Sequence, residues 1–66
     1  MSEAFDILMD TKICLAETEA SLTLATHCPG PGAVEFRQQA LSSANSAIKR
    51  LRELEKVIEH DLCNPA

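Results

Sequence analysis

The chain has 66 residues, a net charge of −4 and a hydrophobic fraction of 45%, and its only aromatic residues are two phenylalanines. A chain of this length forms one domain at most, and its acidic balance argues against binding to nucleic acid or to an anionic membrane surface, because both attract basic proteins. No apolar run approaches the roughly 18 residues of a membrane-spanning helix.

The first predicted helix covers about residues 3–27. Ser2 is a suitable N-cap, and Glu3 and Asp6 place negative charge in the first turn, where the helix dipole favours it. Two apolar stripes run along this segment, about 130° apart around a helix of 3.6 residues per turn. A helix with one neighbour needs a single stripe, so we expect two neighbours. The first stripe holds Leu8, Leu15 and Leu22, and the second holds Phe5, Met9, Ile13, Ala16, Ala20 and Leu24.

The sequence Pro29-Gly30-Pro31-Gly32 predicts a tight turn over residues 28–32. Proline and glycine interrupt a helix, and no other proline or glycine occurs before Pro65. The flanking segments are therefore expected to form one antiparallel hairpin.

The second predicted helix covers about residues 33–62 and has one apolar face, with Asn64 and Pro65 as its stop. Folding the chain at the turn brings Leu22 to the level of Ala40. The predicted fold is all-α: a single antiparallel, coiled-coil-like two-helix hairpin over residues 1–66. The predicted hairpin core consists of Leu8, Leu15, Leu22, Leu41, Ala44, Ile48, Leu51 and Ile58.

The second stripe of the first helix has no place in one helix–helix seam. We expect it to be covered either by a second copy of the chain or by a different helical protein, and the sequence leaves these two alternatives open. The predicted partner-binding residues are those of this stripe: Phe5, Met9, Ile13, Ala16, Ala20 and Leu24.

The residues that could carry chemistry are too few and too far apart. His27 and Cys28 lie next to the turn, whereas His60 and Cys63 lie at the opposite end of the hairpin, and a structural zinc site needs four ligands together. No third group orients a Cys–His pair for nucleophilic attack. We therefore expect no enzyme activity, no metal, no cofactor and no small-molecule substrate.

The three cysteines, Cys14, Cys28 and Cys63, are expected to be reduced thiols. Cys28 and Cys63 would lie on the order of 45–50 Å apart at 1.5 Å per residue, which no disulfide spans. The N-terminal residues lack the basic and apolar segments of a secretory signal, and the expected location is the cytoplasm. The role of the cysteines stays open.

The length, the tight turn and the segment Val34-Glu35-Phe36-Arg37-Gln38-Gln39-Ala40-Leu41 resemble the small co-chaperones of type III secretion needle subunits in Gram-negative bacteria. These co-chaperones are two-helix hairpins that often carry an aromatic residue followed by glutamines after the turn. The resemblance implies a bacterial cytoplasmic protein, linked to virulence, that binds a helical-repeat chaperone and keeps a needle subunit monomeric before export.

Two functions are thus predicted. The first is a non-catalytic adaptor or co-chaperone that binds a helical partner and serves protein transport. The alternative is a self-assembling homodimeric four-helix bundle with a structural or regulatory role.

Overall fold

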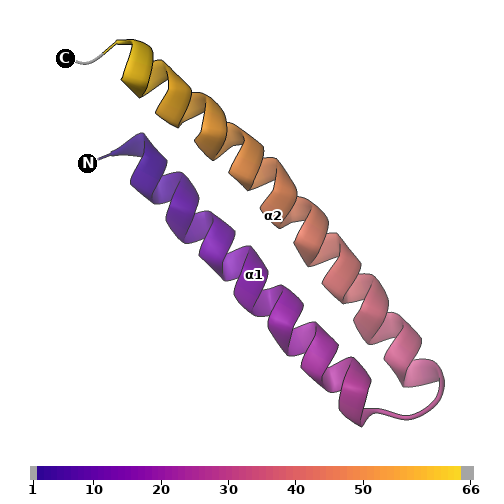
Figure 1. Ribbon diagram of the computed structural model, residues 1–66. Helices are drawn as coiled ribbons and strands as arrows, with labels where there is room; N and C mark the ends of the chain where they lie inside the picture. The colour runs from indigo at the N-terminus through magenta and orange to yellow at the C-terminus, as the bar shows by residue number, and fades with distance from the viewer. Residues whose placement is uncertain (1, 65–66) are drawn as a thin grey trace.

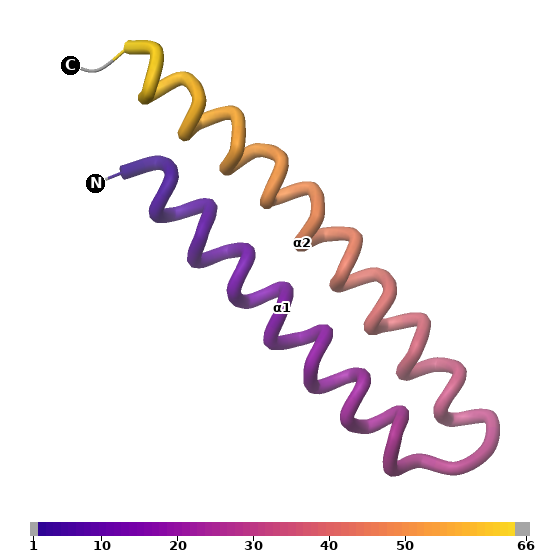
Figure 2. The backbone as a smooth tube through the Cα atoms, in the orientation of Figure 1, coloured from indigo at the N-terminus to yellow at the C-terminus, as the bar shows by residue number. Residues whose placement is uncertain are grey.

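The computed structural model describes residues 2–64 as an antiparallel pair of helices, α1 (Glu3–His27) and α2 (Pro31–Cys63). α1 lies beside α2 along the whole of α1, with the connecting loop at one end and both termini at the other, where α2 extends past the start of α1 (Figure 1; Figure 2). The hairpin is a thin rod with extents of 54 × 16 × 11 Å. No strand occurs between residues 2 and 64, and the predicted all-α hairpin is confirmed. Residues 1, 65 and 66, and with them the predicted stop at Pro65, lie outside the described range.

The ends of α1 lie where the sequence places them. The Ser2 hydroxyl accepts a hydrogen bond from the Phe5 N–H at 3.4 Å, which satisfies one of the free donors at the start of the helix. At the other end, the Cys28 N–H donates to the Leu24 carbonyl at 2.9 Å, and Cys28 itself is extended. The predicted range of residues 3–27 is therefore confirmed.

The loop is shorter than predicted. The turn was expected over residues 28–32, but α2 already begins at Pro31, so only residues 28–30 lie outside the helices. Pro31 fits the first helical position because it has no N–H to leave unpaired and its φ is already helical. Gly30 precedes it with φ 79° and ψ −150°, a conformation that only glycine adopts without strain. At its other end α2 extends to Cys63, one residue beyond the prediction.

Small side chains occupy the most buried positions of the seam between the helices, and a few larger ones are half-buried there. The buried residues are Thr11, Ser21 and Ala25 in α1 and Ala33, Ala40 and Ala47 in α2. The three buried alanines of α2 are seven residues apart, so they share one edge of that helix. Within residues 2–64 no hydrogen bond or ion pair joins α1 to α2. Close packing of small groups therefore holds the pair together.

The two threonine hydroxyls in the seam form hydrogen bonds within α1. The Thr11 hydroxyl donates to the Ile7 carbonyl and the Thr18 hydroxyl donates to the Cys14 carbonyl, both at 2.8 Å. No buried side-chain polar atom of the described residues lacks a hydrogen-bond partner. Threonine can therefore occupy an interior position here without any cross-helix bond.

The predicted hairpin core is wrong for the single chain. Ala44 is half-buried, but the large aliphatic residues assigned to the core are 40% to 63% exposed, and they lie beside the seam instead of inside it. On α1 the seam residues Cys14 and Ser21 directly precede Leu15 and Leu22, so two heptad stripes run side by side. Small residues allow the helix axes to approach closely, and this approach leaves the leucines on the flank. The exposed residues in question are Leu8, Leu15, Leu22, Leu41, Ile48, Leu51 and Ile58.

Candidate functional site

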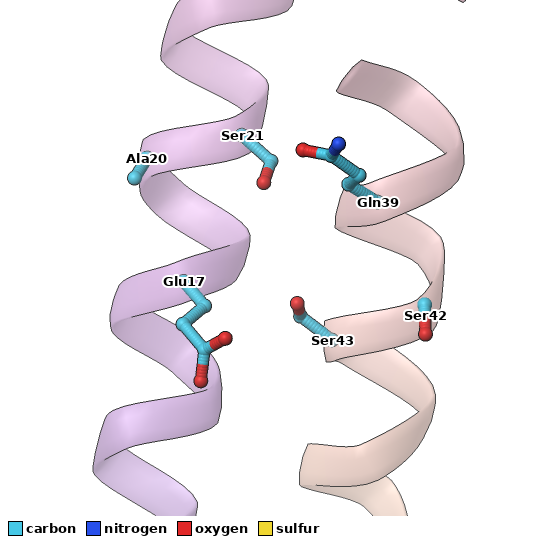
Figure 3. A pocket seen from close by; sticks show the side chains of 6 residues that line it. All are labelled: Glu17, Ala20, Ser21, Gln39, Ser42 and Ser43. Carbon is cyan, nitrogen blue, oxygen red and sulfur yellow. The ribbon is translucent and has the colours of Figure 1, made fainter. Parts of the chain in front are cut away.

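One side of the seam is polar. Glu17 and Ser21 of α1 and Gln39 and Ser43 of α2 point into the groove between the helices, whereas Ala20 points away from α2 (Figure 3). None of these side chains forms a hydrogen bond across the groove. The groove combines one carboxylate with an amide and hydroxyl groups that are not hydrogen-bonded to one another, and it presents a polar surface to solvent.

The other side of the seam is apolar. Leu22 of α1 and Leu41 and Ala44 of α2 line a second groove, in which Ala40 and Thr18 form part of the floor. Further along α2, Ile48 and Leu51 line a third groove on the helix surface.

Side chains seven residues apart extend this apolar side along the rod. Seven residues amount to nearly two helical turns, so each stripe continues on one face of its helix. We call the resulting surface the leucine–isoleucine face. It consists of Leu8, Leu15 and Leu22 on α1 and Val34, Leu41, Ala44, Ile48, Leu51 and Ile58 on α2.

A second exposed apolar surface lies on α1 alone. The six predicted partner-binding residues form an oblique line along the helix, and every one of them is exposed. Phe5 and Ile13 expose 56% and 57% of their surface, although the burial of such side chains is strongly favourable. We call this surface the outer α1 stripe; it consists of Phe5, Met9, Ile13, Ala16, Ala20 and Leu24. Its role in partner binding stays a prediction.

The groups that could carry chemistry are dispersed. No cluster of three or more His, Cys, Asp or Glu side chains suitable for a metal ion occurs in residues 2–64. Cys14 and Cys28 are half-buried, Cys63 is exposed, and all three are free thiols. The single ion pair of the described chain joins Arg50 to Glu53 within α2 at 3.5 Å. Neither helix, over the described residues, is long and apolar enough to cross a membrane.

The small-residue seam was missed in the sequence, although it left a signal. Buried and half-buried positions on each helix alternate at spacings of three and four residues, which is the heptad pattern of a coiled coil. The pattern is hidden because threonine, serine and cysteine occupy several of its positions. The seam consists of Ala4, Ile7, Thr11, Cys14, Thr18, Ser21 and Ala25 on α1 and Ala33, Phe36, Ala40, Ser43, Ala47, Leu54 and Val57 on α2.

No known family model, no curated protein and no solved structure matches this chain.

Proposed function

We propose that the protein is a non-catalytic adaptor that binds a helical protein through exposed aliphatic side chains, with the outer α1 stripe as the contact surface. One observation carries this proposal: nothing within the hairpin covers the large side chains of the outer α1 stripe. Phe5, Met9, Ile13 and Leu24 are 42% to 57% exposed, whereas the four buried hydrophobic residues are all alanines. A hairpin built this way gains most from burial when another protein covers it.

The shape of the outer α1 stripe suits a helical partner. Met9 and Ile13 lie four residues apart, so they are neighbours on one face and can enter the groove between two helices of another protein. Full burial of one such side chain is worth roughly 1.5–3 kcal/mol. The acidic residues that flank the stripe, Asp6 and Asp10, favour a partner with basic residues around its groove.

The finer proposal takes the partner from the resemblance described above. In that reading the protein is a bacterial cytoplasmic co-chaperone, and its partners are a helical-repeat chaperone and the needle subunit of a type III secretion system. The hairpin fold, the tight loop at Gly30 and the segment 34–41 support this assignment.

The test is co-expression of the chain with a needle subunit and its helical-repeat chaperone from the same genome, followed by purification through a tag on the chain. We expect a complex of fixed stoichiometry with the wild type and none with Ile13→Asp, because Ile13 is 57% exposed and its replacement leaves the hairpin intact. Asn45→Asp, which introduces the same charge at an exposed position of α2, is the control.

The result separates the two levels of the proposal. Loss of the complex with Ile13→Asp but not with Asn45→Asp supports both levels. Absence of any complex with the wild type rejects the secretion assignment. The general adaptor proposal is then tested with host extract, and it fails if wild type and Ile13→Asp retain the same proteins.

A further inference from the structure

The leucine–isoleucine face contains four charged residues. Lys12 and Glu19 follow the same spacing of three and four residues as Leu8, Leu15 and Leu22, so they lie between these leucines. On α2, Arg37 lines the groove with Leu22 and Leu41, and Glu55 lines the groove with Ile48 and Leu51. Arg52 also lines that last groove, but it falls outside the spacing and lies at the rim. Each helix therefore presents one positive and one negative charge within the apolar face.

The two charge pairs share one centre along the rod. The midpoint of Lys12 and Glu19 lies between Leu15 and Ala16, and the midpoint of Arg37 and Glu55 lies at Ser46.

The grooves define which levels of the two helices are adjacent. Across the polar groove, Ser21 lies beside Gln39 and Glu17 lies beside Ser43. In the apolar groove, Leu22 lies beside Ala40 and Leu41. Both helices rise by the same distance per residue, so this register can be extended along the antiparallel pair. It places the junction of Leu15 and Ala16 beside Ser46. Both charge pairs are thus centred on one cross-section of the hairpin.

We infer that a second copy of the chain covers the leucine–isoleucine face, related to the first by a two-fold axis that lies in the interface between the copies, at the level of this cross-section and perpendicular to the length of the rod. Under this symmetry α1 packs antiparallel on α1 of the second copy, and α2 on α2. Lys12 then meets Glu19 of the second copy, and Arg37 meets Glu55. Leu15 meets its own counterpart at the axis, and Leu8 meets Leu22.

The charges favour this arrangement over the other symmetric one. If both loops lay at the same end, α1 would pack on α2 of the second copy. Lys12 and Glu19 would then lie at the levels of Ile48 and Leu41, without an opposite charge beside them. Alignment of all four charges into opposite pairs is the kind of complementarity that sets the register of an interface.

The exposed area also fits a dimer. The chain exposes 5137 Å², whereas a compact monomer of 7.2 kDa exposes about 4,100 Å². If each copy hid the difference of about 1,000 Å², the interface would bury about 2,000 Å² in total, at the upper end of the standard range for stable complexes. The resulting four-helix bundle would hold the leucines and isoleucines in its centre and leave Met9 and Ile13 on its surface. The dimer is therefore independent of the adaptor proposal and is tested separately.

The first experiment measures mass by light scattering over a wide range of concentration. We expect twice the 7.2 kDa of one chain. A monomer at every concentration overturns the inference. Leu15→Asp should abolish the dimer, and Ile13→Asp, which is on the other surface, should leave it intact. Loss of the dimer with Ile13→Asp but not with Leu15→Asp overturns the choice of face.

The second experiment tests the symmetry by oxidation of single cysteines in a chain whose Cys14, Cys28 and Cys63 are replaced by serine. Leu15→Cys should crosslink two copies, because this position meets itself at the axis. Leu8→Cys alone and Leu22→Cys alone should not crosslink, but a mixture of the two should. Efficient crosslinking of Leu8→Cys alone, with none at Leu15→Cys, overturns the axis.

The third experiment reverses charges. Lys12→Glu should raise the dimer dissociation constant about tenfold or more, because two opposite pairs become like pairs, and Lys12→Glu combined with Glu19→Lys should restore it. Reversal at Arg50, which lies off the face and pairs with Glu53 of its own helix, is the control. Equal dissociation constants for the single and the double variant overturn the proposed pairing.

Discussion

Leu22 of α1 and Leu41 of α2 line one groove beside the helix seam, and they expose 50% and 63% of their surface, while Ala40 in the same groove exposes only 4%. The hairpin therefore places a small side chain where the helices touch and large ones where they face outward. A helix pair that folded for its own stability alone would do the reverse, since large side chains contribute most of the hydrophobic stabilisation. This arrangement supports the proposals that another protein and a second copy of the chain cover the exposed side chains.

Replacement of Ala47 by leucine should destabilise the hairpin. Ala47 is 2% exposed, and extra methylene groups in a close seam force the helices apart, with an expected loss of about 1–3 kcal/mol in the free energy of unfolding. Urea unfolding followed by circular dichroism measures the change. Ala20→Leu, on the exposed back of α1, is the matched control and should be neutral within about 0.5 kcal/mol. Equal stability of the two variants would contradict a close seam.

The two loop glycines should respond to alanine in opposite directions. Gly30→Ala should destabilise the protein by about 1 kcal/mol or more, because φ 79° is strained for any residue with a Cβ, although no atom lies within 4 Å of that Cβ. Gly32 lies in the first turn of α2, and an added Cβ would lie 3.9 Å from the Cys28 sulfur, an ordinary contact. Gly32→Ala should therefore stabilise by about 0.4–1 kcal/mol. Thermal unfolding of both variants at one concentration measures the difference.

Thr11→Val should be tolerated although Thr11 is 1% exposed. Its hydroxyl bonds to the Ile7 carbonyl, which also accepts the regular backbone hydrogen bond of the helix, so the substitution leaves no buried group unpaired. The expected change is within about 1 kcal/mol in either direction. Thr23→Val, where an exposed threonine makes the same 2.8 Å bond to the Glu19 carbonyl, controls for the loss of the hydroxyl itself. A loss of several kcal/mol at Thr11 would mean that its hydroxyl has a partner outside α1.

The cysteines should react with thiol reagents in the order of their exposure. Cys63 is exposed at the end of α2, whereas Cys14 is half-buried at the seam and Cys28 is half-buried in the loop. A coloured disulfide reagent should therefore label one thiol fast and two slowly, and Cys63→Ser should remove the fast phase only. Simultaneous labelling of all three thiols would show that the seam opens faster than the reagent reacts.

The sequence by itself determined the helices and their order. Ser2, the Pro-Gly segment and the absence of other helix breakers define two helices, and their lengths permit only an antiparallel pair with Leu22 at the level of Ala40. These features are local, since capping and helix breaking depend on a few neighbouring residues. The predicted start of α2 was two residues too late, because a proline such as Pro31 fits both a turn and the first position of a helix.

Only the tertiary structure decided which stripe forms the seam. One heptad stripe of α1 contains Leu8, Leu15 and Leu22, and a neighbouring mixed stripe contains Thr11 and Ser21. The two stripes are only a few residues apart along the chain, so either could face α2. Hydrophobicity favours the leucines, whereas close approach of the helix axes favours the small residues. The hydroxyls of Thr11 and Thr18 cost little in the mixed stripe because they bond within α1. The outcome depends on how the side chains of both helices pack against each other. The sequence of one helix alone does not contain this information.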